Sequence, residues 1–309
     1  MVAVLGPTAS GKSVLSLALA EAFGGEIVSC DSAAVYRGFD IGTDKVPLGE
    51  RRGIPHHLID VADPTEVYTA ARYARDAAAA VRETHARGRL PVLAGGTGFY
   101  FRALTRGLFP GPGRDPRLRE RLQQLERRHG EGFLHRMVGR VDPESAARIQ
   151  PRDTMRLVRA LEVYFLTGRP LTAHFAATVS PLPGVRVIAL LVQVAGPVLA
   201  ARIDQRVAGH FARGLVDEVR GLLARGVPAT APPFGSLGYR QVLEHLQGAR
   251  DEAATRELIA RETRHYARRQ LIWFRKEPNL EPGPGPGELR AAIASATAIA
   301  GRRLRDRGP

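Results

Sequence analysis

Residues 2–13 read VAVLGPTASGKS, and this stretch decides the fold of the chain. Its apolar start predicts a strand that ends at Gly6, and the leucine- and alanine-rich run after Ser13 has the spacing of a helix. The two glycines have no Cβ, so backbone N–H groups of the turn can face an anion at the helix N-terminus. We interpret the stretch as a P-loop, in which Lys12 reaches terminal phosphate oxygens and Ser13 ligates magnesium.

A glycine-rich turn before an ordinary helix is the alternative, but it would not require the strand, the spacing and the Lys-Ser pair together. The P-loop therefore predicts that the chain binds a di- or triphosphate. The residues predicted to hold it are Gly6, Pro7, Thr8, Ala9, Ser10, Gly11, Lys12 and Ser13.

The size and composition of the chain suit a two-lobed protein. At 309 residues it can form one full α/β core and a smaller appendage. No apolar run is long enough for a membrane span, and the first strand begins without a basic leader, so we expect a cytoplasmic location. Cys30 is the only cysteine, which excludes an intramolecular disulfide, and its apolar strand indicates a buried residue rather than a reactive thiol.

The net charge of +14 comes almost wholly from arginine. The planar guanidinium group suits phosphate, so the charge favours a polyanionic partner such as nucleic acid. A GC-rich genome also enriches a protein in arginine and alanine. The positions of the arginines therefore matter more than their number.

Two further strands are predicted to end beside the P-loop. Asp31 follows the apolar run 26–30, and Gly95-Gly-Thr-Gly98 follows the apolar run 89–94. Because the carboxyl ends of parallel strands face the ligand crevice, Asp31 should lie near the phosphates as a base or magnesium ligand, with the Thr97 hydroxyl close to a ligand. Each also has a purely structural alternative, since Asp31 can cap the following turn and Thr97 can cap the following helix.

Residues 114–181 are predicted to form a helical insertion between strands of the sheet. Residues 107–113 have the glycine- and proline-rich composition of a hinge, helical spacing follows them, and the next strand-like run begins at Val185. The predicted fold class is thus α/β, a P-loop NTPase-like parallel sheet flanked by helices with an inserted all-helical domain. Its parts are the P-loop core in two pieces (1–113 and 182–278), the insertion (114–181), and a Pro/Gly linker with a C-terminal tail (279–309).

Two long helices with rows of arginine are predicted in the second half of the chain. In the helix from 197 to 225, Arg206 is the candidate for a phosphate contact, and a solvated face is the alternative for the row as a whole. That row is Arg202, Arg206, Arg213 and Arg220. In the helix from 251 to 276, a similar row suits a nucleic-acid backbone. Its members are Arg261, Arg264, Arg268 and Arg275, with Tyr266 and Trp273 on the other side as core residues.

Eight short motifs follow one another from residue 2 to about residue 276. They are Gly6-Pro-Thr-Ala-Ser-Gly-Lys-Ser13, Asp31-Ser32, Asp40-Ile-Gly-Thr43, Pro55-His-His-Leu58, Gly95-Gly-Thr-Gly98 with Tyr100, Arg159-Ala-Leu-Glu-Val163, Gly238-Tyr-Arg-Gln241 and Arg269-Gln-Leu-Ile-Trp273. Only the P-loop is specific by itself. In this order, the set resembles that of the tRNA dimethylallyltransferases, also called tRNA isopentenyltransferases.

The resemblance implies a reaction in which a dimethylallyl group moves from dimethylallyl diphosphate to N6 of the adenosine 3′-adjacent to the anticodon, and pyrophosphate is released. The P-loop would hold the diphosphate, with Mg²⁺ as cofactor on Ser13 and with Arg206 taking up charge on the leaving group. Asp31 would accept a proton from the amine, which Thr97 would orient. The implied partners are tRNA, through its anticodon stem-loop, and dimethylallyl diphosphate. We expect a monomer without membrane contact.

The resemblance also implies a set of tRNA contacts, since the stacked adenine must leave the anticodon loop to react. The expected positions are Asp31, Ser32, Ala33, Ala34, Thr97, Arg119, Met155, Arg156, Leu157, Val158, Arg159, Gly235, Gly238, Tyr239, Arg240, Arg268 and Arg275. Three features depart from the family pattern. Ala34 stands where many relatives have glutamine, which removes a side-chain contact to a base, and Cys30 stands where alanine is common, which should be harmless. No final strand is evident after Lys276.

Three other functions share parts of this pattern. A P-loop small-molecule kinase would use the same loop for ATP and Asp31 as base for a hydroxyl. An adenylate isopentenyltransferase would prenylate free nucleotide, but it would need neither the helical insertion nor the arginine row of 251–276. A non-catalytic RNA-binding module would not depend on Asp31.

Overall fold

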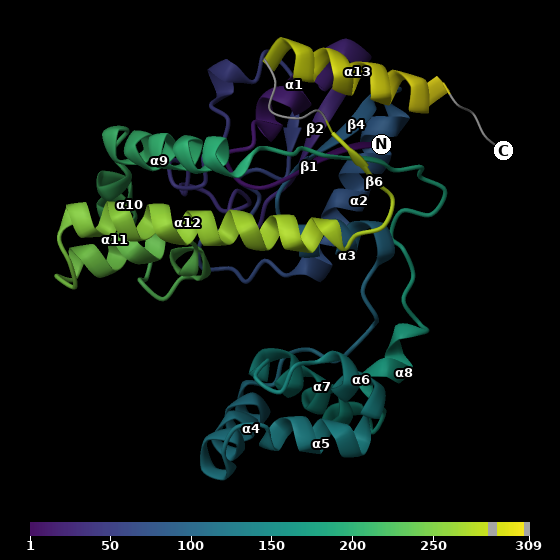
Figure 1. Ribbon diagram of the computed structural model, residues 1–309, viewed down its shortest axis with the longest axis vertical. Helices are drawn as coiled ribbons and strands as arrows, with labels where there is room; N and C mark the ends of the chain where they lie inside the picture. Colours follow the sequence, from purple (N-terminus) through teal and green to yellow (C-terminus); the bar gives the residue numbers. More distant parts are fainter. Residues whose placement is uncertain (284–288, 306–309) are drawn as a thin grey trace. The chain divides into compact units, whose positions relative to one another are not determined.

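The computed structural model describes residues 1–283 and 289–305, which divide into two compact units (Figure 1). Unit 1 comprises Met1–Thr105 and the chain from Leu182 onward. Unit 2 is the segment between them, Arg106–Pro181. Unit 2 is therefore inserted into the sequence of unit 1, between Thr105 and Leu182.

Unit 1 is built on a six-stranded sheet in the order β3-β2-β4-β1-β5-β6, in which every pairing is parallel. The strands are β1 (Val2–Leu5), β2 (Gly25–Cys30), β3 (His56–His57), β4 (Leu90–Gly95), β5 (Ile188–Leu191) and β6 (Leu280–Pro282). Parallel strands covered on both faces are continuously apolar, and β1 and β5 are buried at every position. The predicted fold class is confirmed.

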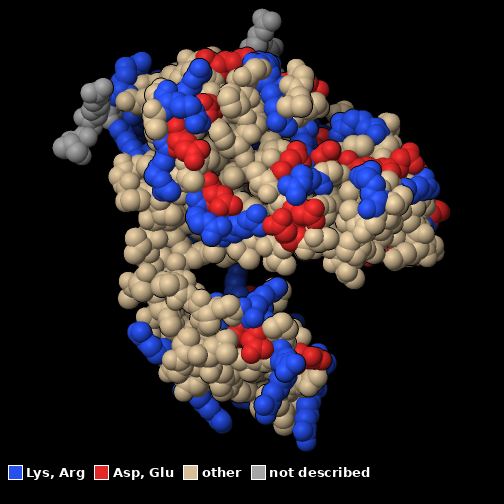
Figure 2. Space-filling view, turned by 180° about the vertical axis from the view of Figure 1, so that it is seen from behind, with Lys and Arg blue, Asp and Glu red and all other residues tan. Residues whose placement is uncertain are grey.

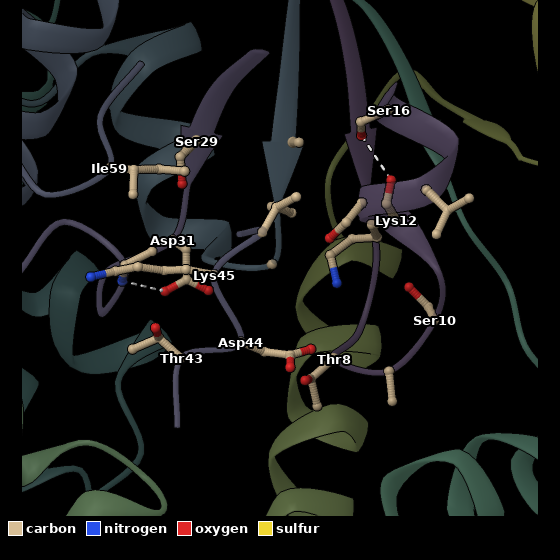
Figure 3. A pocket seen from close by; sticks show the side chains of 18 of the residues that line it. Thr8, Ser10, Lys12, Ser16, Ser29, Asp31, Thr43, Asp44, Lys45 and Ile59 are labelled. Atoms are coloured by element: carbon tan, nitrogen blue, oxygen red, sulfur yellow. Dashed lines mark hydrogen bonds between the residues drawn. The ribbon is translucent and has the colours of Figure 1, made fainter. Parts of the chain in front are cut away.

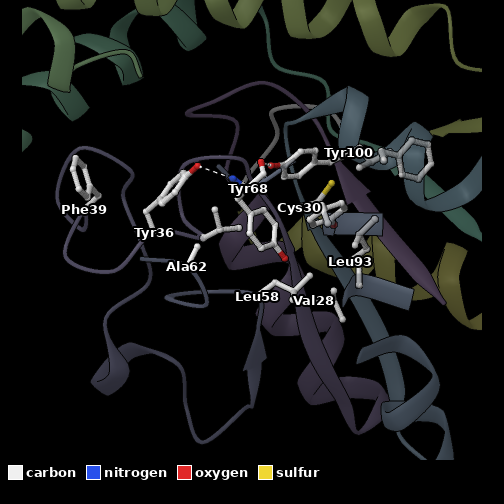
Figure 4. Close-up of a cluster of buried hydrophobic side chains, with 14 of the residues drawn as sticks. Val28, Cys30, Tyr36, Phe39, Leu58, Ala62, Tyr68, Leu93 and Tyr100 are labelled. Atoms are coloured by element: carbon white, nitrogen blue, oxygen red, sulfur yellow. Dashed lines mark hydrogen bonds between the residues drawn. The ribbon is translucent and has the colours of Figure 1, made fainter. Parts of the chain in front are cut away.

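Alternate residues of the central strands form two separate cores, one on each face of the sheet. On one face, Val2 and Val4 pack with Leu15 and Leu19 of α1 and with Ala296 of α13, and α13 lies beside α1 in Figure 1. On the other face, a larger core surrounds Val28, Cys30 and Leu93 (Figure 4). The single cysteine is buried there, as predicted.

Tyrosine hydroxyl groups within the larger core are satisfied by the backbone of neighbouring segments (Figure 4). The hydroxyl of Tyr36 accepts a hydrogen bond from the backbone N–H of Tyr68 at 3.2 Å, and that of Tyr100 donates to the Tyr68 carbonyl oxygen at 3.2 Å. A buried hydroxyl without a partner would cost free energy. These bonds fix the segment that follows β3 against the helix that follows β4.

Helices and two short 3₁₀ turns connect the strands of unit 1. The helices are α1 (Lys12–Phe23), α2 (Ala70–Ala86), α3 (Gly98–Arg106), α9 (Gly196–Ala212), α10 (Leu215–Ala224), α11 (Tyr239–Leu246), α12 (Glu252–Arg275) and α13 (Leu289–Arg305), and the turns are η1 (Leu48–Glu50) and η2 (Pro232–Gly235). The expected single helix from 197 to 225 is wrong. Gly214 has a φ of +88°, a left-handed conformation that ends α9 and starts α10.

A final strand, which is not evident from the sequence after Lys276, is present. β6 pairs in parallel with β5, with Leu280 opposite Ala189 and Pro282 opposite Leu191. Proline is tolerated because β6 is an edge strand. The C-terminal tail contains α13, which packs on the sheet, while residues 284–288 of the predicted linker lie outside the described residues.

Unit 2 consists of five helices around its own apolar core in the described chain. They are α4 (Pro116–His129), α5 (Phe133–Val141), α6 (Pro143–Arg148), α7 (Thr154–Thr167) and α8 (Leu171–Phe175). Three of them start at an aspartate whose side chain accepts a hydrogen bond from a backbone N–H of the first turn: Asp115, Asp142 and Asp153. Such caps satisfy orphan donors and fix where each helix begins.

Across residues 1–283 and 289–305, none of the helices combines the length and the apolar character needed to cross a membrane.

Candidate functional site

The P-loop connects β1 to α1 in a conformation that its sequence permits. Gly11 has a φ of +91° and Ala9 a φ of +61°, and at Gly6 a Cβ would lie only 3.0 Å from the Val192 carbonyl oxygen. Gly11 caps α1 without a side-chain hydrogen bond to its first turn. The first N–H groups of α1 are therefore available to an anion, with the positive end of the helix dipole behind them.

A pocket of about 520 Å³ opens in front of the P-loop (Figure 3). Lys12 points into it from α1, and Asp31 lies across from Lys12 at the end of β2. The sequence-predicted residues that line the pocket are Thr8, Ala9, Ser10, Gly11, Lys12, Ser13, Asp31, Ala34 and Arg206. They come from the carboxyl edge of the sheet, where ligands of such folds bind.

Lys12 and Ser13 occupy the first turn of α1 in different environments. The ammonium group of Lys12 donates to the Pro7 carbonyl oxygen at 2.6 Å. Burial, helped by the charge of Arg206, lowers the pKa of Lys12 to about 8. The Ser13 hydroxyl is exposed and has no hydrogen-bond partner within the described chain, so it is free to ligate a cation.

Gln270 of α12 connects the P-loop to the loop after β4, and the sequence analysis did not single it out. Its Oε1 accepts a hydrogen bond from the Thr8 N–H at 2.8 Å, and its Nε2 donates to the Gly96 carbonyl oxygen at 2.8 Å. A Cβ at Gly96 would lie 2.3 Å from that Nε2. The available signal was its place in the motif Arg269-Gln-Leu-Ile-Trp273.

Asp31 and Thr97 are brought together because β2 and β4 are neighbours, with Cys30 opposite Gly95. The Thr97 hydroxyl accepts a hydrogen bond from the Ser32 N–H at 3.1 Å. Oδ1 of Asp31 accepts from the N–H groups of Ala33 and Ala34 at 2.8 and 3.2 Å. Oδ1 therefore caps the following turn, which is the structural alternative considered for Asp31. Oδ2 has no hydrogen-bond partner among the described residues.

Tyr266 of α12 also lines the pocket on the Asp31 side. Burial and the nearby charge of Asp31 raise the pKa of its phenol, which stays protonated at neutral pH. From the sequence, Tyr266 is expected in the core. The structure places it at the pocket wall instead.

Arg206 reaches the P-loop from α9, as the sequence analysis predicts for a phosphate contact. Its Nη1 donates to the Thr8 hydroxyl at 3.1 Å, and its Nη2 lies 3.0 Å from Oδ2 of Asp44. Arg202 also approaches the P-loop, with Nη1 3.5 Å from the Ser10 carbonyl oxygen. Arg213 follows the last residue of α9, lines the same pocket and pairs with Asp44 at 2.9 Å. Arg220, on α10, instead forms an exposed pair with Asp217.

Several residues expected to contact tRNA have buried side chains. Burial is not what a side-chain contact with tRNA predicts. Leu157 and Val158 belong to the core of unit 2, because they lie on the inner face of α7. Tyr239 is fully buried, and its hydroxyl donates to Glu218 at 2.5 Å and accepts from the Gly42 N–H at 3.0 Å. Ala34 is buried as well.

Arg119 and Arg159, also expected at the tRNA, form ion pairs with the completely buried carboxylate of Glu162. Arg119 does so with both ends of its guanidinium group, at 2.6 and 2.7 Å. Arg159 lies 2.6 Å from the same carboxylate and donates to the Pro112 carbonyl oxygen at 3.0 Å. Arg119 therefore holds α4 to α7, while Arg159 of α7 binds the segment before α4 through the Pro112 carbonyl oxygen.

We expect Arg119→Met to lower the free energy of unfolding of unit 2 by about 3 kcal/mol, because it leaves a buried carboxylate with one cation instead of two. The measurement is urea denaturation of the full chain. Arg117→Met is the matched control, since Arg117 is exposed on the same helix. Equal stability of both variants would show that the buried pair contributes little.

The remaining expected tRNA residues are accessible or lie in turns. Lys and Arg side chains are spread over the visible surface of each unit (Figure 2). Gly238 has a φ of +93° and starts α11. The exposed members are Ser32, Met155, Arg156, Arg240, Arg268 and Arg275. Arg240 pairs with Glu262 at 2.8 Å, whereas Arg268 and Arg275 on α12 have no ion-pair partner in the part of the chain that the structure describes.

A family model and curated relatives both match this chain, and their descriptions agree. A family model described as IPP transferase matches residues 34–277. The chain is 54% identical to the tRNA dimethylallyltransferase of Solibacter usitatus, with 91% of both chains covered, and 46% identical to that of Geobacter metallireducens, with 96% of both covered.

Two solved structures extend the similarity to the fold. The full-length tRNA isopentenylpyrophosphate transferase from Bacillus halodurans is similar with a TM-score of 0.72 at 34% identity, covering 98% of this chain and 96% of that one. A eukaryotic dimethylallyltransferase acting on tRNA is similar with a TM-score of 0.77 at 26% identity, covering 97% of this chain and 77% of that one.

Proposed function

This chain belongs to the IPP transferase family, and we propose that it transfers a dimethylallyl group from dimethylallyl diphosphate to N6 of the adenosine 3′-adjacent to the anticodon in tRNA. Its relatives are tRNA dimethylallyltransferases, and the chain is accordingly an enzyme that prenylates tRNA adenosine. The observation that supports the detailed reaction best is the pocket itself, which has a phosphate-binding loop on one side and Asp31 on the other. Thr97 does not line the pocket but lies next to Asp31, where its hydroxyl accepts from the Ser32 N–H.

The P-loop side would stabilise the leaving pyrophosphate. The adenine amine is a weak nucleophile because its lone pair is delocalised into the ring, so the departing group must be strongly stabilised. Backbone N–H groups of α1, the ammonium group of Lys12 and the guanidinium group of Arg206 face the same space. Donors fixed before the reaction need no reorganisation as charge develops, which makes such stabilisation effective.

The opposite side would handle the acceptor. N6 of the adenine forms a bond to C1 of the dimethylallyl group while the C1–O bond to diphosphate breaks. The amine proton passes to Oδ2 of Asp31, the carboxylate oxygen that the turn leaves available. Thr97 is held beside Ser32 and would orient the amine by a hydrogen bond.

The residues present fit a magnesium ion held mainly by the substrate. Residues 1–283 and 289–305 contain no cluster of three or more His, Cys, Asp or Glu side chains that could form a protein-only metal cage. The exposed Ser13 hydroxyl at the start of α1 is a suitable single oxygen ligand. Mg²⁺ bound there would neutralise charge on the diphosphate.

The test of the proposed function is a mass increase of unmodified tRNA transcript incubated with dimethylallyl diphosphate, Mg²⁺ and the full chain. An added dimethylallyl group on the adenosine next to the anticodon is expected. Transfer of a γ-phosphate from ATP to a small acceptor without prenylation would favour the kinase, and prenylation of free adenine nucleotide would favour the adenylate isopentenyltransferase.

We assign the exposed face of α12 to the tRNA backbone, because Arg268 and Arg275 are exposed there without ion-pair partners within the described residues. Arg268→Ala and Arg275→Ala should each weaken tRNA binding and reduce the slope of log K against log salt by about 1, since each removes one phosphate contact. The measurement is fluorescence anisotropy across a salt series.

Arg256→Ala is the control for this prediction, because Arg256 lies on the same helix but is paired with Glu252 at 2.5 Å. Salt slopes that do not differ between the variants would place the RNA elsewhere. A helical tRNA-binding role for residues 114–181, a monomeric state and a cytoplasmic location remain predictions.

A further inference from the structure

The pocket contains an acidic residue that the proposed reaction does not use. Asp44 lines the pocket on the P-loop side, and its side chain is 28% exposed (Figure 3). A carboxylate beside a diphosphate site is unfavourable unless other groups compensate its charge. The guanidinium groups of Arg206 and Arg213 do so.

The carboxylate of Asp44 lies 3.0 Å from Nη2 of Arg206, 2.9 Å from Nη2 of Arg213 and 3.5 Å from Nε2 of the buried His210. Burial raises the pKa of Asp44, but the neighbouring His210 and Arg206 outweigh it, and the pKa is held well below its usual value. Asp44 is therefore ionised at neutral pH.

Arg206 divides its donors between Asp44 and the P-loop. While Nη2 faces Asp44, Nη1 donates to the Thr8 hydroxyl at 3.1 Å. An arginine side chain has several rotatable bonds and loses conformational freedom when it is fixed on a ligand. Two partners that fix it beforehand reduce that loss.

The loop that carries Asp44 is itself fixed to α10 and α11. Glu218 accepts hydrogen bonds from the N–H groups of Asp40 and Ile41 at 3.0 and 2.8 Å, and Tyr239 binds both Glu218 and the Gly42 N–H. A Cβ at Gly42 would lie 2.5 Å from the Tyr239 ring. The position of the Asp44 carboxylate is thus determined by packing outside the pocket.

We infer that Asp44 is a positioning residue whose carboxylate holds the Arg206 guanidinium group over the P-loop, ready for the diphosphate. This inference rests on the proposed function. In the opposite role, Asp44 would compete with the diphosphate for the arginines. Asp44→Asn would then bind dimethylallyl diphosphate more tightly than the unsubstituted chain.

The test compares binding of dimethylallyl diphosphate to the full chain and to Asp44→Asn by titration calorimetry with Mg²⁺ present. Asparagine keeps the shape and tolerates the φ of +55° at this position. We expect about tenfold weaker binding, the effect of one lost charge-assisted hydrogen bond. Asp217→Asn is the matched control, because it removes a carboxylate from an exposed pair with Arg220 on α10 and should leave the affinity unchanged.

A double-mutant cycle separates positioning from general damage to the pocket. In an Arg206→Ala background, Asp44→Asn should cause little further loss, because the guanidinium group that Asp44 holds over the P-loop is absent and only the pair with Arg213 remains. Asp44→Ser, measured in parallel, should behave like Asp44→Asn in both backgrounds.

Additive losses in the cycle, or tighter binding by Asp44→Asn, would overturn the inference while leaving the proposed function intact. Failure of the unsubstituted chain to bind dimethylallyl diphosphate would instead contradict the proposed function.

Discussion

Asp31→Asn is expected to lower kcat for prenyl transfer by about 10²–10⁴-fold, the range of a lost general base. Asparagine keeps an oxygen that can accept from the N–H groups of Ala33 and Ala34, so the turn after β2 should persist. It cannot take the amine proton at Oδ2. The Kd for tRNA should therefore change little, and single-turnover prenylation measured alongside tRNA binding checks both.

Asp63→Asn is a matched control for this experiment. Oδ1 of Asp63 also caps a turn, by accepting hydrogen bonds from the N–H and hydroxyl of Thr65 at 3.0 and 2.7 Å, but Asp63 does not line the pocket. It should retain full turnover. An Asp31→Asn variant that binds tRNA poorly yet prenylates bound tRNA at the normal rate would contradict the role of Asp31 as base.

Lys12→Ala is expected to lower kcat/KM by about 10²–10³-fold, the usual effect of removing one fixed donor from a developing oxyanion. The free enzyme should also show a pH dependence that originates at this residue. With a pKa of about 8, Lys12 is a cation below pH 8 and loses its charge above it. The affinity for dimethylallyl diphosphate should then fall as pH rises from 7 to 9 through that value.

The Lys12→Ala variant provides the control for the pH series, since it has no charge to lose at this position. Its weaker affinity should be flat between pH 7 and 9, apart from changes that the ligand itself causes in both proteins. The same fall in the variant as in the unsubstituted chain would assign the pH dependence to another group.

The parallel sheet and the P-loop could be predicted from the sequence because each depends on local pattern. Gly6 and Gly11 adopt backbone conformations that their residue type favours, and β1 is apolar throughout because both faces of the sheet are covered. Asp31 and Thr97 were predicted to share a site because adjacent parallel strands end at the same edge.

Features that depend on contacts distant in sequence could not be predicted in the same way. β6 has three residues, too few for a pattern, and forms because β5 offers a free edge. The family resemblance implied that Tyr239 and Leu157 contact tRNA, yet packing buries both side chains. Asp44 is an ordinary acid in a polar loop until the fold brings α9 against it.

The side-chain amide of Gln270 links two loops that are far apart in sequence. It joins the Thr8 N–H on the donor side to the Gly96 carbonyl oxygen on the acceptor side, and the same helix carries Arg268 and Arg275 on its outer surface. Any displacement of α12 would disturb both halves of the pocket at once. The proposed tRNA contact on the outer surface of α12 and the proposed diphosphate site at the P-loop would therefore be coupled through Gln270.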